Sequence, residues 1–142
     1  GLAEHERACQ EIQDELGLKY LRIGDMGCFQ FFSPVAESVR NDEALTITEF
    51  LALKCSDDWT NYAGMRVWVE HSIFNRSPAK AEIKGDTVRD VLLAIDEALE
   101  SNLTEDERIN GRSCFLEEIY HGVGTPIELM DGEDDLLIGL GS

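Results

Sequence analysis

Hydrophobic positions at helical spacing predict two main helices. In the segment 3–16 the apolar residues form one stripe and the charged residues lie between them, and Gly17 follows as a stop signal. The clearest helix is predicted over 88–101, where an almost complete apolar face recurs at helical spacing. Asp86 or Thr87 is expected to cap the start of this helix.

Alternation of apolar and polar residues predicts the strands. They are expected over 20–23, 28–32, 45–54, 65–74, 80–84, 113–120, 126–130 and 136–140. The first two are predicted to form a hairpin, and the polar segment 56–64 reads as a loop. The fold class is therefore α+β, with a mixed or antiparallel sheet packed on the helix 88–101 and an added N-terminal helix over 3–16.

Length and the absence of repeats indicate one domain over 1–142. No apolar run reaches the roughly 18 residues that span a bilayer. The first residues lack the pattern of a signal peptide, although a leader removed earlier stays open. We expect a soluble protein of the cytoplasm or a host-cell interior, with secretion as the alternative.

Charge is the unusual property of the chain. Acidic residues number 29 against 12 basic ones, which gives a net charge of −17. From Ser113 to Ser142 there is no Lys or Arg. A field of this sign repels nucleic acid and anionic membranes and attracts basic proteins, so direct nucleic-acid or membrane binding is not expected. Acidity that serves only solubility is the alternative.

The cysteines and histidines do not form a recognisable site. Cys9, Cys28, Cys55 and Cys114 lack the close spacing of zinc or redox motifs, so buried thiols are expected, and two disulfides in a secreted protein stay open. A nucleophilic pair, Cys114 with His121 or Cys28 with His71, has no supporting motif.

Two metal-like patterns are also incomplete. Glu118 and His121 have the spacing of a di-iron motif but lie in a predicted strand and occur once. The acidic residues at 131, 133 and 135 imitate a calcium loop that lacks its glycine and its final glutamate. We therefore expect no catalytic residue, no metal and no cofactor, and a protein that is not an enzyme.

Aromatic residues near carboxylates are the candidate binding groups. Trp68 occupies one of the strand positions that alternate with the apolar ones, as the polar residues around it do. Two further aromatic residues lie in the loop 56–64. Aromatic groups dominate interface hot spots and attract cations, although the first half of the chain could instead cover Trp68. The candidate partner-binding residues are Asp57, Asp58, Trp59, Tyr62, Trp68, Glu117, Glu128, Asp131, Glu133, Asp134 and Asp135.

Part of the chain resembles a known family. Gly85 to Leu92 is similar to the segment Gly-Asp-Thr-Val-x-Asp-Leu-Leu, Asn110-Gly111 follows the helix, and Pro126 to Asp134 is a loose version of a late Asp-Gly segment. On these residues, 65–141 resembles the ubiquitin-like β-grasp fold of the sulfur-carrier proteins of molybdopterin and thiamin synthesis. Those carriers end in Gly-Gly, whose carboxylate is activated, whereas this sequence reads Gly-Leu-Gly-Ser over 139–142.

Three functional hypotheses follow. The first is a non-enzymatic acidic module, an inhibitor or adaptor that docks on a basic partner such as a nucleic-acid-binding protein. Immunity proteins and DNA mimics are similar to it in composition. The second is a ubiquitin-like or sulfur-carrier protein, as the resemblance implies. The third is a secreted effector held by two disulfides, which a count of free thiols would test. The oligomeric state is not predicted.

Overall fold

The described chain contains both helices and strands that share one sheet, and the predicted α+β class is confirmed. The computed structural model describes residues 2–24, 46–54, 63–64, 66–71, 79–109, 114–121 and 135–141. Its elements are α1 (Leu2–Leu16), β1 (Leu21–Arg22), α3 (Ile47–Leu51), β2 (Arg66–His71), β3 (Ala79–Glu82), α4 (Val88–Asn102), α5 (Glu105–Ile109), β4 (Cys114–His121) and β5 (Asp135–Gly141). Both helices of the prediction and the strands near 20–23, 65–74, 80–84, 113–120 and 136–140 are confirmed, and the segments 28–32 and 126–130 lie outside the described residues.

Helix α4 begins at a capping box. Thr87 is the N-cap, and its hydroxyl accepts a hydrogen bond from the Asp90 backbone N–H at 3.3 Å. The Asp90 carboxylate in turn accepts the Thr87 backbone N–H at 3.1 Å, so two donors at the helix start are satisfied reciprocally. The buried face of the helix consists of Val88, Val91, Leu92, Ala94, Ile95, Ala98 and Leu99.

Gly85 is required by this cap. A Cβ atom at position 85 would lie 2.2 Å from Oδ2 and 2.6 Å from Cγ of Asp90. No side chain other than hydrogen leaves room for the carboxylate to reach the Thr87 N–H. The Gly-Asp-Thr motif is therefore explained locally, by the space that the helix cap needs.

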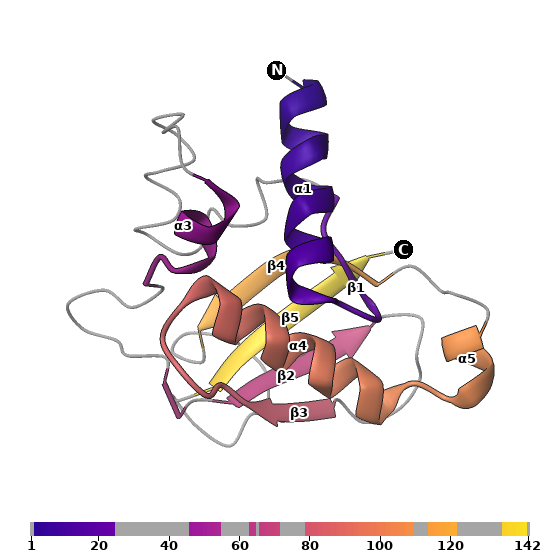
Figure 1. Cartoon of the computed structure of the whole chain (residues 1–142). Helices are drawn as coiled ribbons and strands as arrows, with labels where there is room; N and C mark the ends of the chain where they lie inside the picture. Colours follow the sequence, from indigo (N-terminus) through magenta and orange to yellow (C-terminus); the bar gives the residue numbers. More distant parts are fainter. Residues whose placement is uncertain are drawn as a thin grey trace.

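The sheet is mixed and has five strands in the order β1-β4-β5-β2-β3. The pairs β4–β5 and β2–β3 are antiparallel, whereas β2–β5 and β1–β4 are parallel. Helix α4 lies across one face of the sheet, where it packs on β2 and β3 (Figure 1). The last strand, β5, therefore lies in the middle of the sheet. One neighbour, β2, precedes α4 in the sequence, and the other, β4, follows it.

The core lies between α4 and this face of the sheet. On β2 and β5 every second position is buried, as in Val67 and Val69 and in Leu136, Ile138 and Leu140. Residues from α1, β1 and α3 join the same cluster, among them Cys9, Ile12, Leu21, Phe50 and Leu51. The N-terminal segments therefore extend one core with the rest of the described chain.

Helix α1 ends at a glycine motif that turns the chain toward the sheet. Gly17 has a φ of +62°, a conformation that favours glycine, and its N–H bonds the Asp14 carbonyl at 3.3 Å. The Leu18 N–H bonds the Gln13 carbonyl at 3.2 Å, which completes a Schellman motif, and the Leu18 side chain is buried. The predicted stop at Gly17 is confirmed.

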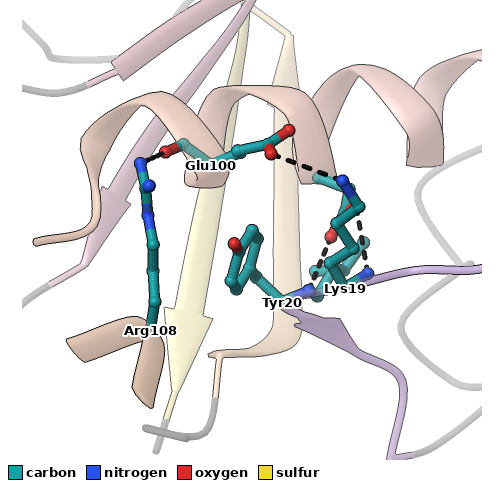
Figure 2. Close-up of polar contacts among 6 residues, drawn as sticks. Lys19, Tyr20, Glu100 and Arg108 are labelled. Carbon is teal, nitrogen blue, oxygen red and sulfur yellow. Dashed lines mark hydrogen bonds and ion pairs between the residues drawn. The ribbon is translucent and has the colours of Figure 1, made fainter. Parts of the chain in front are cut away.

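A single carboxylate then holds the segment 19–21 against α4. Oδ1 of Asp96 accepts the backbone N–H groups of Tyr20 and Leu21, both at 2.9 Å, and Oδ2 accepts that of Lys19 at 3.1 Å. Figure 2 shows Lys19 and Tyr20 beside α4, with the Lys19 ammonium 3.4 Å from the Glu100 carboxylate. At the end of α4, the guanidinium of Arg108 donates to the Glu100 carbonyl and ties α5 to the helix (Figure 2).

One of the predictions for the first half is wrong. The segment 45–54 was expected as a strand, but Ile47–Leu51 is the helix α3. Thr46 and Glu49 form a capping box, and a helical turn buries the adjacent Phe50 and Leu51 together, which a strand would place on opposite faces. Strand β1 pairs in parallel with β4, and the predicted hairpin of 20–23 with 28–32 is not tested, because 28–32 lies outside the described residues.

We predict that Asp96 is the most important polar side chain for stability in this part of the molecule. Asp96→Ala removes the acceptor of three backbone donors, and we expect a loss of about 3 kcal/mol in the free energy of unfolding. Asp96→Asn keeps one oxygen and should lose less. Urea denaturation measures the change, and Glu97→Ala, at an exposed neighbouring position, is the control, with an expected loss below about 0.5 kcal/mol. Equal losses at positions 96 and 97 would contradict the role of Asp96.

A second prediction concerns the space at Gly85. Gly85→Ala should cost about 1–2 kcal/mol of unfolding free energy, because the new methyl group displaces the Asp90 carboxylate from the helix cap. In an Asp90→Ala background the clashing atoms are gone, so the same change should cost almost nothing. A double-mutant cycle by thermal or urea unfolding measures this coupling. A cost that is the same in both backgrounds would show that position 85 needs glycine for another reason.

Candidate functional site

An open hollow lies between α1 and α3. It has a volume of about 300 Å³ and is lined by Glu11, Asp14, Glu15 and Ile47. The three acidic residues are spaced i, i+3 and i+4 on α1, so their side chains share one face of the helix. Ile47 is half-buried and is the first residue of α3. The hollow therefore combines carboxylates with an apolar surface.

Two of these carboxylates form no ion pair within the described part of the chain. The Asp14 side chain accepts a hydrogen bond from Gln10 at 2.9 Å. Within the described residues, neither Glu11 nor Glu15 takes part in an ion pair, and both are exposed. The described ion pairs, Lys19–Glu100 and Lys84–Glu97, both involve α4. Glu11 and Glu15 thus take part in neither of these ion pairs.

The position of Ile47 is set by the cap of α3. The Glu49 carboxylate accepts the Thr46 backbone N–H at 3.1 Å, and the Thr46 hydroxyl accepts the Glu49 N–H at 3.1 Å. The hydrogen bond from the Thr46 backbone, followed by that from its hydroxyl, lowers the pKa of Glu49 below its ordinary value of 4.5. Glu49 therefore stays ionised in mildly acidic solution and keeps its cap.

The sheet face away from α4 carries part of the predicted partner-binding set. Positions that alternate with the buried ones on β2, β5, β4 and β3 form this outer face. Among the described residues at these positions, Lys80 and Glu82 are exposed, and Arg66 and Gly139 are half-buried. Across the strands, the outer face has three rows of paired positions. They are Glu118–Gly139–Glu70, Tyr120–Leu137–Trp68–Lys80 and Asp135–Arg66–Glu82.

Trp68 and Asp135 are brought near each other by this register. Trp68 pairs with Leu137 of β5, two residues after Asp135, which pairs with Arg66. Glu117 marks a β-bulge, since Leu116 pairs with Leu140 and Glu118 with the next residue, Gly139. This bulge interrupts the regular alternation of β4. The other candidate residues, Asp57, Asp58, Trp59, Tyr62, Glu128, Asp131, Glu133 and Asp134, lie outside the described residues.

The candidate pair Cys28 with His71 is not tested, because Cys28 lies outside the described residues, and the other catalytic alternatives gain no support from the part of the chain that is described. Cys114 and His121 are the first and last residues of β4, about 23 Å apart along an extended strand, so they cannot form a nucleophilic pair. Glu118 and His121 lie on the same strand and not on the helix that a di-iron motif needs. Among the described residues, no three His, Cys, Asp or Glu side chains gather as metal ligands. The described helices also include none with the length and apolarity to cross a membrane.

Sequence reasoning missed the hollow. Glu11 and Asp14 were read as part of a charged helix face that points away from the core, and the segment that contains Ile47 was expected to be a strand. The signal that could have identified α3 is Thr46 followed three residues later by Glu49, the pattern of a capping box.

Comparisons with known proteins give no relative for this chain. No family model matches it, and neither a curated protein nor a solved structure is significantly similar.

Proposed function

We propose that the chain is a non-enzymatic protein-binding module, an inhibitor or adaptor whose acidic surface docks on a basic surface of a partner protein. The observation that carries this proposal is the hollow between α1 and α3, where Glu11 and Glu15 border the half-buried Ile47. A net charge of −17 supports the same class of partner. A nucleic-acid-binding protein in the cytoplasm or a host-cell interior fits this description.

The chemistry of the hollow suits a lysine or arginine side chain. Such side chains have an apolar stem that packs on aliphatic groups and a charged end that seeks carboxylates. Ile47 offers the apolar contact, and Glu11, Asp14 and Glu15 surround it with oxygen acceptors. Binding of this kind needs no cofactor and no bond making.

Neutralising the hollow should weaken binding to a basic probe. We predict that Glu11→Gln with Glu15→Gln reduces affinity for a fluorescein-labelled octalysine peptide about five- to tenfold at low salt, because both carboxylates lack a described cation. Glu97→Gln with Glu105→Gln changes the net charge equally and should reduce it less than about twofold. Fluorescence anisotropy at about 50 and 300 mM NaCl measures both variants and the salt dependence.

The two double variants distinguish binding at the hollow from attraction by the overall negative charge of the chain. Equal losses in the two double variants would mean that the hollow is not a specific site. If the unmodified chain does not bind the peptide at low salt, the proposed function is wrong.

A second candidate function is an adaptor of the ubiquitin-like β-grasp class. The specific observation in its favour is the arrangement of residues 66–141, in which a hairpin, a helix and two strands give the order β3-β2-β5-β4 with β2 and β5 parallel at the centre. This order is the one that the resemblance implies. β1 adds a further parallel strand beside β4.

Carrier chemistry is the less favoured form of this second candidate. Gly139 and Gly141 both belong to β5 and pair with Glu118 and Phe115, whereas an activated Gly-Gly end must enter the site of another enzyme. We therefore predict no adenylate on this chain after incubation with ATP and an activating enzyme of the sulfur-carrier class. Intact-mass spectrometry detects the adduct, and a cognate carrier is the positive control. An ATP-dependent adduct would favour the carrier over the adaptor.

A further inference from the structure

The face of α1 that borders the hollow carries a row of charged side chains. Arg7, Glu11 and Glu15 are all exposed and follow one another at intervals of four residues, so they lie along one face of the helix. Four residues rise about 6 Å along a helix axis, which is the spacing of the row. Its order is one positive charge and then two negative charges toward the C-terminal end of α1.

The acidic part of this row opens on the hollow. Glu11 and Glu15 line the hollow together with Asp14, and Ile47 of α3 adds a half-buried apolar side chain to it. The three carboxylate side chains are exposed, so a partner can reach them from solvent. A partner that lies along the row therefore meets charged groups and an apolar contact together.

The carboxylates occupy the end of α1 where they stabilise the helix least. Asp14 and Glu15 belong to the last turn of α1, and that turn has no basic residue. The C-terminal end of a helix carries a partial negative charge, so acidic groups there are unfavourable for the helix and add to the local negative field. The charges of this face therefore do not serve the stability of α1, and they suit a cationic group near its C-terminal end.

A partner that lies along α1 has to satisfy its own main chain. The backbone groups inside a helix are bonded within that helix, so the flank of α1 offers no backbone partners to an extended strand. A helical partner brings a satisfied backbone, and a helix docked in a groove is a common mode of peptide recognition. Its side chains also recur every four residues, at the spacing of the row on α1.

We propose that the hollow and the adjoining face of α1 bind an amphipathic helix of the partner protein. Two basic residues of that helix, one turn apart, pair with Glu11 and Glu15. An acidic residue one further turn away pairs with Arg7, and an apolar side chain packs on Ile47. The inference rests on the proposed function and deepens it, because it gives the basic surface of the partner a conformation and an order of charges.

Charge complementarity selects this occupant. A second copy of the chain would bring another −17 charges to an acidic surface, and nucleic acid would bring phosphates. A purely basic helix would place a cation against Arg7. A helix with two basic residues and one acidic residue in a row matches all three charges of the face.

The test compares two labelled alanine-rich peptides of the same composition, each with one leucine beside a row of three charges. The first has Glu, Lys and Lys at intervals of four residues, and the second has Lys, Glu and Lys. By anisotropy on the full chain at low salt, we predict that the first peptide binds about threefold tighter, because only its order matches Arg7, Glu11 and Glu15 together. The second order favours helix formation in the free peptide, so helicity does not explain such a preference.

Reversal of the charge at Arg7 should remove the preference. Arg7→Glu makes the row uniformly acidic, so the two peptides then form equal numbers of matched and opposed pairs. Arg89→Glu, at an exposed position of α4, changes the net charge equally and should leave the preference as it is. Circular dichroism checks that both variants remain folded.

A central proline in the first peptide tests the helical conformation of the partner. Proline breaks a helix because it lacks the backbone donor and its ring clashes with the preceding turn. We expect the affinity of the proline peptide for the full chain to fall about fivefold or more, since its charges no longer lie in one row.

The results distinguish this inference from the proposed function. Equal affinity for the two orders of charge, equal effects of Arg7→Glu and Arg89→Glu, or undiminished binding of the proline peptide would overturn the inference. If Glu11→Gln with Glu15→Gln still weakens binding of octalysine in that case, the proposed function stands. No binding of octalysine or of either helical peptide to the unmodified chain would overturn both.

Discussion

The arrangement of the described chain depends on the Asp96 carboxylate and the three backbone N–H groups that it accepts. Residues 19–21 leave a helix and enter the edge of a sheet, so their donors need partners outside regular structure. Asp96 supplies one for Lys19, Tyr20 and Leu21 from the flank of α4. Helix α4 therefore organises the molecule in two ways, through the apolar face that packs on the sheet and through this polar contact with the N-terminal segment.

Both walls of the hollow are positioned relative to α4. Helix α1 is joined to the segment 19–21 by the rigid Gly17 turn, so the Asp96 contact also restricts where α1 can lie. Helix α3 is tied to the other end of α4, because the Val88 N–H donates to the Leu53 carbonyl at 3.0 Å and Lys54 forms a bridge with Thr87. The acidic face of α1 and Ile47 of α3 are thus brought together by one helix to which neither belongs.

The parts of the fold that were predictable from sequence are those in which a local pattern and the core agree. The face of α4, the stop at Gly17 and the alternation of β2 and β5 all follow from residues near one another in the chain. The segment 45–54 was misread because its apolar residues alternate well enough for a strand, while the Thr46–Glu49 cap and the adjacent Phe50 and Leu51 decide for a helix. The parallel pairing of β1 with β4 joins Leu21 to Cys114, and no local pattern reports a contact over that separation. The candidate site was only partly predictable, since the acidic positions of α1 can be read from the sequence while the place of Ile47 beside them depends on the helix α3.

The acidic composition overstates how much charge is available for a partner. Several carboxylates in the described chain already serve as backbone acceptors: Asp90 and Glu49 in the caps of α4 and α3, Glu107 in that of α5 at 2.8 Å, and Asp96 in the N-terminal contact. These groups would be needed whatever the protein binds, because helix starts and turns leave donors that an anion satisfies well. The informative carboxylates are those without such a task, such as Glu11 and Glu15 in the hollow. A binding surface in this protein is therefore better located by asking which acids the fold does not use than by following net charge along the sequence.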